Sequence, residues 1–359
     1  MGSHQLTTPM KQKALKPKAM FLMNEGMLSM FFTPADIEEL HKLLDFVGPP
    51  VTADELAELG NKFADVEVIC GSYGMSVLTE KVLAQLPKVR VIIYSGGTVK
   101  PVMFYHGTTL KPFMTEEAWQ RGIRITNAAY ANARPVAEFA LALIILSLKR
   151  ALAQAAILRT KRTFDFPIHD PLVVGTYKTT VGILSLSMVG RKLVELLKIL
   201  DVSILAYDPT VDAATAAMLG VELCSMEEVF SRSHVVSCHM PLLPATTHIL
   251  RRHHFESMRP GATFVNTARG GIVAESEMIE VLQRRPDLFA ALDVTDIEPA
   301  PSDSLLHTLP NVFLTPHIAG SAAGERFRMG GLALEEIRRY VLGKPLVHEV
   351  AREKLPLLA

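Results

Sequence analysis

Three predicted strands in the C-terminal half of the sequence are each followed by a side chain that can bind an anion or exchange a proton. "ATFVNTARG" leads to Arg269, "AALDVTDIEP" to Glu298 and "VFLTPH" to His317. Arginine holds a carboxylate through two hydrogen bonds, and histidine gives and takes protons near neutral pH. A carboxylate beside the histidine orients its ring and favours the protonated form. Because ligands of open α/β sheets bind beyond the carboxyl ends of strands, the set predicts acid–base chemistry on a carboxylate-bearing substrate.

Each of the three residues also has a purely structural interpretation. Arg269 fits a strand-end ion pair, Glu298 an acidic residue before a proline, and His317 a packed histidine in a turn. Taken singly, those interpretations are the commoner ones. Their joint occurrence at strand ends in one half of the chain favours function.

A turn that resembles a dinucleotide-binding turn lies at residues 182–191, "GILSLSMVGR". The three glycine positions of Gly-x-Gly-x-x-Gly hold Ser185, Ser187 and Gly190, and Ser187 stands where a helix N-cap is expected. About twenty residues later Asp208 ends a predicted strand, where a carboxylate meets the ribose 2′-hydroxyl. That carboxylate would repel a 2′-phosphate, which favours NAD over NADP. The alternatives are a plain strand–turn–helix and an aspartate that only forms a turn before Pro209.

Apolar runs of strand length alternate with amphipathic helical segments along the chain, which predicts a parallel α/β protein. A long helix is expected from Pro135 through residue 158, apolar nearly all round in its first half. A loop is expected over residues 161–179. The last helical segment, after Pro316, is expected to pack back on the first part of the chain.

Composition excludes several classes of protein. The 359 residues suggest two domains, and Lys+Arg equals Asp+Glu at 37 each, so the chain carries no electrostatic signature for nucleic acid or an anionic membrane. Three distant cysteines without a C-x-x-C pair suggest a reducing compartment. The longest apolar run, residues 139–148, is too short to span a bilayer. A cytoplasmic protein without nucleic-acid or membrane partners is expected.

Six stretches occur in this order: "NARPVAEFALALIILSLKR", "ILAYDP", "VVSCHMPLLPATTHIL", "MRPGATFVNTARGGIV", "ALDVTDIEPAP" and "LPNVFLTPHIAGS". The ordered set resembles the D-2-hydroxyacid dehydrogenase family of D-isomer-specific, NAD-dependent enzymes. The resemblance implies a doubly wound, Rossmann-type nucleotide domain inserted into a flavodoxin-like substrate domain, with the active site between them. The implied boundaries are 20–145 with 322–359 for the substrate domain, 146–321 for the nucleotide domain and 1–19 for a flexible tail.

The resemblance also implies roles for individual residues. Arg269 matches the substrate-carboxylate arginine, and Glu298 and His317 match the acid–base pair. Gly97 and Thr98, in "YSGGTVKP", match a loop whose backbone holds the substrate carboxylate, although an ordinary glycine turn is the alternative. No metal ligands are implied. The residues expected to line the NAD site are Ser185, Ser187, Met188, Val189, Gly190, Asp208, His239, Met240, Pro241, Thr246, Thr267, Ala268 and Asp293, the last near the nicotinamide amide.

The implied activity is hydride transfer between NAD(H) and a small D-2-hydroxy acid or 2-oxo acid, in a homodimer formed through the helical region near residues 135–158. A sensor or scaffold that binds NAD(H) without turnover is the alternative, since the family includes a transcriptional corepressor branch. Formate oxidation is disfavoured, because those relatives pair the histidine with glutamine where this chain has Glu298.

The sequence departs from the family pattern in four places. Serines replace two glycines of the turn, Met188 replaces a basic or polar residue, and His234 stands where the family often has aspartate. Residues 102–110 look inserted, and their Phe104, Tyr105 and His106 are expected either to line the cleft or to form a surface excursion. The altered turn predicts weaker NAD binding than a full glycine turn gives.

Overall fold

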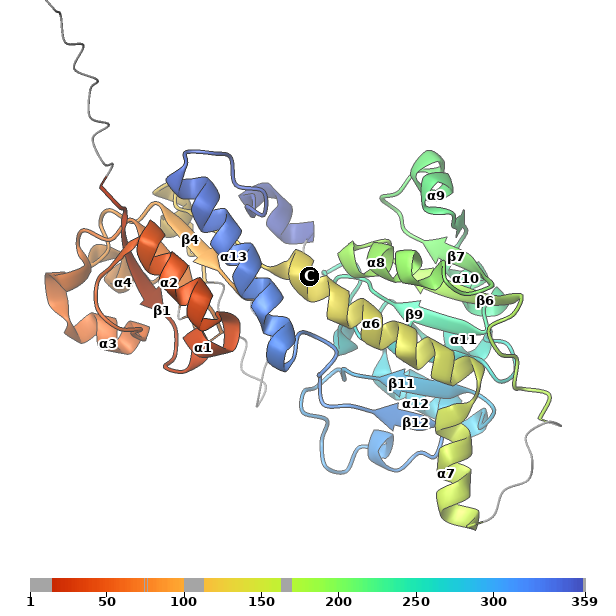
Figure 1. The fold of residues 1–359 in the computed structure, drawn as a ribbon. Coiled ribbons are helices and arrows are strands. Elements are labelled where there is room, and N and C mark those ends of the chain that lie inside the picture. The colour runs from red at the N-terminus through yellow and green to blue at the C-terminus, as the bar shows by residue number, and fades with distance from the viewer. Residues whose placement is uncertain (1–14, 74, 76, 100–112, 163–169, 358–359) are drawn as a thin grey trace, which may run out of the picture.

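The computed structural model describes residues 15–73, 75, 77–99, 113–162 and 170–357. Two parallel sheets organise them into two lobes, and the helix α6 (Ala129–Leu148) runs from one lobe into the other (Figure 1). The predicted insertion at residues 102–110, with Phe104, Tyr105 and His106, lies outside the described residues.

The first sheet has the strand order β2-β1-β3-β4-β5, the order of a flavodoxin-like sheet. Its strands are β1 (Lys18–Leu22), β2 (Asp45–Phe46), β3 (Val68–Gly71), β4 (Val91–Tyr94) and β5 (Arg124–Thr126). Its helices are α1 (Met27–Phe31), α2 (Pro34–Leu43), α3 (Ala53–Glu58), α4 (Glu80–Ala84), α5 (Glu116–Gln120) and α13 (Arg326–Val341). One core lies between the sheet and α1, α2 and α13, and a second core lies beneath α3, α4 and α5. Because both faces are covered, β3 and β4 consist entirely of buried residues.

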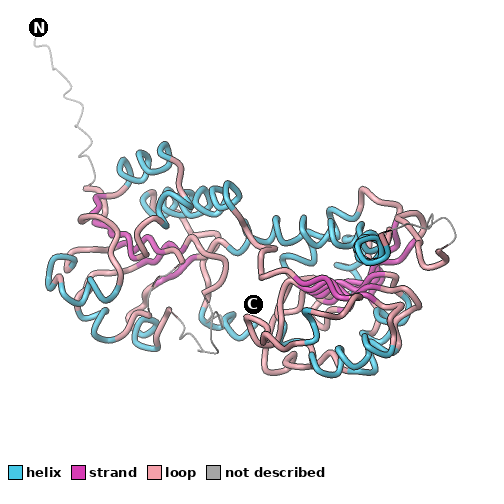
Figure 2. The backbone as a smooth tube through the Cα atoms, turned by 90° about the horizontal axis from the view of Figure 1, so that it is seen from below, coloured by secondary structure: helices cyan, strands magenta, loops and turns pink. Residues whose placement is uncertain are grey.

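The second sheet has the order β12-β11-β10-β9-β6-β7-β8, again all parallel. Its strands are β6 (Thr179–Leu184), β7 (Val202–Tyr207), β8 (Glu222–Leu223), β9 (Val235–Cys238), β10 (Thr263–Asn266), β11 (Phe289–Leu292) and β12 (Val312–Leu314). Its helices are α7 (Ala151–Lys161), α8 (Met188–Leu197), α9 (Ala213–Leu219), α10 (Met226–Arg232), α11 (Arg252–Glu256) and α12 (Glu275–Arg284). The edge-on view in Figure 2 shows helices on both faces, with α6, α8 and α9 packed in one core and α10, α11 and α12 in the other. The order reverses between β6 and β9, where doubly wound sheets bind their ligands. The predicted fold class is confirmed.

The helical region near residue 150 differs from the prediction. Instead of one helix from Pro135 to residue 158, α6 begins six residues before Pro135, and α7 follows as a separate helix. Arg150 divides them: its N–H bonds the Ser147 carbonyl, and its φ of 50° is left-handed. No glycine marks this break, so the sequence carries no signal for it. Two smaller differences are the two-residue strands β2 and β8, which were not predicted, and β1, which includes Lys18 and Ala19 of the predicted tail.

With its 20 residues, α6 is long and apolar enough to cross a membrane, whereas the longest apolar run noted in the sequence, residues 139–148, covers only half of it. Half of its most apolar window is buried inside the protein. Leu143, Ile144 and Leu148 pack into a core of the second sheet. The helix is therefore a core helix of the fold.

Candidate active site

Six strands of the second sheet end in register. Leu184 pairs with Tyr207 and Cys238, Asn266 with Cys238 and Leu292, and Leu292 with Leu314. The residues that follow these ends therefore stand side by side along one edge: Ser185, Asp208, His239, Thr267, Asp293 and Thr315. All but Thr315 were predicted to line the NAD site, so the sheet brings these five predicted residues to one edge.

The predicted histidine and glutamate are in direct contact. His317 Nδ1 lies 2.9 Å from Glu298 Oε2, with the two side chains 27% and 19% exposed. Burial lowers the pKa of the Arg269 guanidinium, and the charge of the nearby Glu298 offsets part of that shift. Arg269 Nη1 donates to the Ala268 carbonyl at 2.6 Å, and its other nitrogens have no hydrogen-bond partner among the described residues. The predicted histidine, glutamate and arginine thus share one site.

Close backbone contact links the loop of Arg269 to the loop of Glu298. A Cβ on Gly270 would lie 1.9 Å from the Thr295 carbonyl carbon, so only glycine permits this approach. Glu298 Oε1 accepts a long hydrogen bond from Thr295 N at 3.4 Å. Gly270 thereby sets the spacing between the loop of Arg269 and the loop of Glu298.

Asp293 anchors the loop that carries His317. Its buried carboxylate accepts hydrogen bonds from Ile318 N and Ala319 N, both at 2.8 Å, and from Thr315 Oγ1 at 2.6 Å. Its carbonyl accepts the His317 N–H at 2.9 Å. His317 has a left-handed φ of 54°, a conformation that the surroundings of a non-glycine residue must impose. The sequence reasoning placed Asp293 beside the nicotinamide and missed this anchoring.

The serine-containing turn has the geometry that its spacing predicts. Ser187 is the N-cap of α8: its hydroxyl accepts Gly190 N–H at 3.4 Å and donates to the His239 carbonyl at 2.8 Å. A Cβ on Gly190 would lie 2.1 Å from the Ser185 carbonyl oxygen, so the third glycine keeps its packing role. Ser185 adopts a left-handed φ of 76°. In the first turn of α8, Met188 is 47% exposed and Val189 is partly buried.

Asp208 lies beside this turn. Burial raises the pKa of its carboxyl, but hydrogen bonds from Thr210, Leu186 and Ser185 outweigh burial and lower the pKa. Asp208 is therefore a carboxylate at neutral pH.

The loop after β9 is tied together internally. Thr246 Oγ1 donates to the Pro241 carbonyl at 2.6 Å and accepts Leu243 N–H at 2.8 Å. The Met240 side chain packs in the sheet core. Burial lowers the pKa of His239 to about 3, so its ring is neutral.

On the first lobe, Gly97 and Thr98 follow β4, and Ala128 N–H donates to the Gly96 carbonyl at 2.9 Å. Asn132, in the first turn of α6, connects this loop to the His317 loop. Its Oδ1 accepts Ser321 N–H at 2.8 Å, and a Cβ on Gly97 would lie 3.1 Å from its Nδ2. Sequence reasoning gave Asn132 no role, although it opens the first of the six matching stretches.

Comparison with known proteins gives the site its context. Residues 141–319 match the family model described as "D-isomer specific 2-hydroxyacid dehydrogenase, NAD binding domain". A D-3-phosphoglycerate dehydrogenase of Methanocaldococcus jannaschii is 30% identical over 92% of this chain and 60% of its own length. A hydroxypyruvate reductase of Thermotoga maritima is 29% identical over 85% of this chain and 95% of its own length.

The chain belongs to the D-isomer-specific 2-hydroxyacid dehydrogenase family. It spans about half to three fifths of the length of the D-3-phosphoglycerate dehydrogenases that it matches. Among solved structures, a phosphoglycerate oxidoreductase of Rhizobium etli has a TM-score of 0.77 at 22% identity, covering 95% of this chain and 100% of its own. An apo D-mandelate dehydrogenase of Rhodotorula graminis has a TM-score of 0.74 at 23% identity, covering 94% and 98%.

The cofactor of this family domain is a nicotinamide dinucleotide, and the residues at the sheet edge fit it. Thr267 Oγ1 and His239 Nδ1 are buried without a hydrogen-bond partner among the described residues. Buried polar atoms without a protein partner are rare unless a ligand or water supplies the missing hydrogen bond. Together with the N-terminus of α8 and the Asp208 carboxylate, they form a set of polar groups suited to a pyrophosphate and sugar hydroxyls.

His234 performs a structural role at the position where this family often has aspartate. The ring Nδ1 of His234 accepts the Thr180 backbone N–H at 3.0 Å, and the backbone N–H of His234 donates to the Thr180 carbonyl at 2.8 Å. Burial and the nearby Arg259 lower the pKa of His234, so the neutral ring acts as the acceptor.

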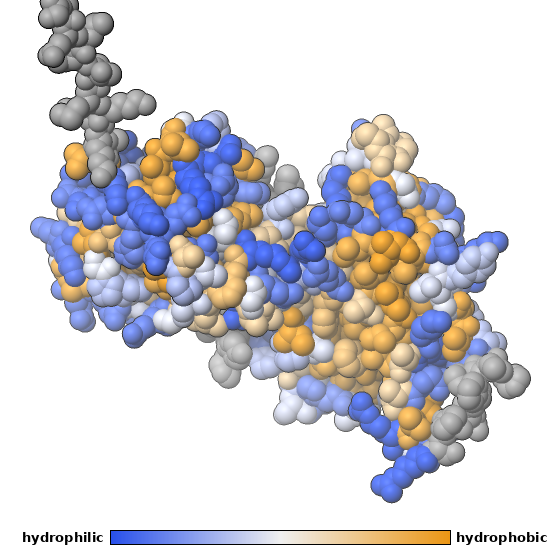
Figure 3. Space-filling view, viewed as in Figure 1, coloured by the Kyte–Doolittle hydropathy of each residue, from blue (hydrophilic) through white to orange (hydrophobic). Residues whose placement is uncertain are grey.

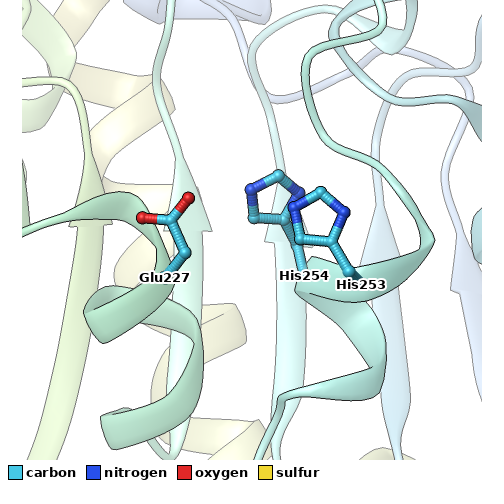
Figure 4. Close-up of side chains that lie close together, drawn as sticks. All are labelled: Glu227, His253 and His254. Carbon is cyan, nitrogen blue, oxygen red and sulfur yellow. The ribbon is translucent and has the colours of Figure 1, made fainter.

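One cluster of the described residues has ligand types that bind transition metals. Glu227, His253 and His254 place one ligand atom each within 4.8 Å of the others (Figure 4). His254 Nδ1, however, accepts the Arg251 N–H at 3.0 Å, so a neutral ring carries its proton on Nε2. A protonated nitrogen has no lone pair for a metal. The cluster is better explained by an imidazole N–H directed toward a carboxylate.

Proposed function

We propose that this protein is an NAD-dependent dehydrogenase that interconverts a small D-2-hydroxy acid and its 2-oxo acid. Bound NAD(H) supplies or accepts the hydride. Arg269 and the backbone of Gly97 and Thr98 hold the substrate carboxylate. Nδ1 of His317 faces Glu298, so Nε2 gives the proton to the developing alkoxide in reduction and takes it back in oxidation. Glu298 holds the ring and offsets the charge of the imidazolium, and Arg269 offsets negative charge on the reacting oxygen.

The His317–Glu298 contact carries this proposal. A protein that only senses NAD(H) has no use for a histidine held 2.9 Å from a carboxylate, beside an arginine with donors that bind no other described residue. The names of the relatives agree with a small acid as substrate, since they act on phosphoglycerate or hydroxypyruvate. The position of Asp208 supports NAD rather than NADP, because its carboxylate would repel a 2′-phosphate.

The test is His317→Ala, with NADH oxidation followed at 340 nm over a panel of 2-oxo acids. Loss of a general acid lowers kcat about 10²–10⁴-fold. His253→Ala is the matched control, because it removes an exposed histidine outside the proposed machinery. An unchanged kcat in His317→Ala would overturn the assignment. Tight NADH binding by the wild-type protein without oxidation by any acid would support the sensor instead.

We also propose that the two lobes act as domains, 20–145 with 322–359 and 146–321, which close on the ligand and exclude water. The packing of α13 against α1 and α2 supports the discontinuous first domain. Limited proteolysis with and without NADH tests it: ligand should protect the segments near Asn132 and Ser321, where the two lobes meet.

A homodimer is proposed from the apolar surface along α6 and α7. Leu146, Ile157 and Leu158 are 39%, 42% and 46% exposed, none of the α7 residues is buried, and Figure 3 shows an apolar face over α6. Light scattering after size-exclusion chromatography should give a mass twice that of one chain, which is 39.5 kDa. In Ile157→Glu the measured mass should fall toward that of a single chain. A wild-type monomer would contradict the dimer.

A cytoplasmic location is proposed as well. Its support is the free state of all three cysteines, two of which are buried with their pKa raised to about 12.

A further inference from the structure

The Asp208 carboxylate already has a donor at each of its acceptor positions. Oδ1 accepts Thr210 N–H at 2.9 Å and Thr210 Oγ1–H at 2.7 Å. Oδ2 accepts Leu186 N–H at 2.7 Å and Ser185 Oγ–H at 3.2 Å. A carboxylate offers about four lone-pair positions. A further hydroxyl can therefore bind Asp208 only if one of these four donors leaves.

The four donors differ in how easily they can leave. Two are backbone N–H groups, fixed by the turns in which they lie. The Ser185 hydroxyl belongs to a residue that is only 9% exposed, so breaking its bond would strand a buried donor. Thr210 is exposed, and its hydroxyl can rotate to water. The Thr210 hydroxyl is the donor that gives way at least cost.

The competition for Asp208 depends on the serine that this chain has at position 185. A glycine at position 185 would bring no hydroxyl and would leave Oδ2 with an open acceptor position. Residue 185 has a left-handed φ of 76°, and its carbonyl oxygen lies close against Gly190. Because the buried Ser185 hydroxyl already donates to Oδ2, the Oδ1 side is the one that remains for a ligand.

We propose that a ribose hydroxyl of the dinucleotide binds Asp208 by displacing the Thr210 hydroxyl, so that Thr210 is an internal competitor that sets cofactor affinity. The proposal rests on the proposed function, because it requires a ribose-bearing cofactor at the turn. Thr210 keeps the carboxylate saturated when the site is empty and returns to water when the sugar arrives. The cost of this exchange weakens binding without any contact between Thr210 and the chemistry.

The experiment measures dissociation constants of NADH, by fluorescence, and of ADP-ribose, by calorimetry. Thr210→Val keeps the side-chain shape and the backbone donor but removes the competing hydroxyl. Both dissociation constants should fall about three- to tenfold, the size of one net hydrogen bond. Thr215→Val is the matched control, because Thr215 contacts Asp212, the N-cap of α9, through its backbone N–H and its side chain. It should leave both constants unchanged.

Two further variants keep the result interpretable. Thr210→Ser retains the hydroxyl and should bind like the wild type, whereas Ser185→Ala opens Oδ2 and should also tighten binding. Unfolding curves establish that each variant is folded. If wild-type protein binds ADP-ribose but Thr210→Val binds it equally or more weakly, the competition does not exist and the proposed function stands. If neither probe binds wild-type protein, the proposed function itself fails.

Discussion

Replacement of Asp293 by asparagine should destabilise the protein through the loop that carries His317. The carboxylate accepts three hydrogen bonds at 2.6–2.8 Å and is 1% exposed. In Asp293→Asn one carboxylate oxygen becomes an NH₂ group that faces a backbone N–H. A buried donor is then left without an acceptor, which costs about 1–3 kcal/mol of stability. The remaining bonds lose their charge assistance, about 1 kcal/mol in total. The free energy of unfolding should therefore fall by about 2–4 kcal/mol.

Urea denaturation of the ligand-free protein measures this loss. The control is Asp296→Asn, three residues along the same loop, whose carboxylate pairs with His248 at 3.1 Å in a partly exposed position. That pair should contribute less than about 1 kcal/mol. A loss within about 0.5 kcal/mol of zero in Asp293→Asn, together with weaker NADH binding, would refute the anchoring role and leave only a contact with the cofactor.

Three further variants test separate parts of the structure. Gly190→Ala places a Cβ 2.1 Å from the Ser185 carbonyl oxygen, so thermal unfolding should reveal a loss of about 3 kcal/mol, and near-wild-type stability would mean that the turn can move. His239 is neutral when folded, with its pKa lowered by burial to about 3, but takes a proton when unfolded, so stability falls as pH drops below its ordinary value of 6.5. Between pH 7 and pH 5 the free energy of unfolding, measured by urea titration, should therefore fall by about 2 kcal/mol less in His239→Gln than in the wild type, and an unchanged pH dependence would contradict the burial of a neutral His239. Asn132→Ala removes the acceptor of the Ser321 N–H, so hydrogen exchange at that amide should accelerate about tenfold, whereas an unchanged rate would mean that Asn132 holds nothing there.

The site residues that sequence reasoning located best are those directly after strands. Apolar runs mark the ends of parallel strands, and parallel strands end at one edge, so Asp208 and Thr267 could be placed without a structure. Ser187 as N-cap followed from its position before an amphipathic helix. The contact between Glu298 and His317 was expected because both residues follow strands in the same half of the chain.

Features that depend on tertiary contacts could not be predicted from the sequence. The break between α6 and α7 lies at Arg150, a residue type that gives no sign of a left-handed turn. Asn132 reads as an ordinary helix residue until the Ser321 loop, 189 positions away, is brought against it. The saturation of Asp208 follows from the rotamers of Ser185 and Thr210, which spacing does not determine.

Reduction of NAD⁺ by matched D and L isomers of a series of 2-hydroxy acids, with NADP⁺ in parallel, decides whether the protein is a D-specific, NAD-dependent dehydrogenase. We expect absorbance at 340 nm to grow with at least one D isomer and NAD⁺, to grow little with the L isomer or NADP⁺, and to stay flat in His317→Ala. No turnover with any D acid, or turnover that survives the loss of His317, would contradict it.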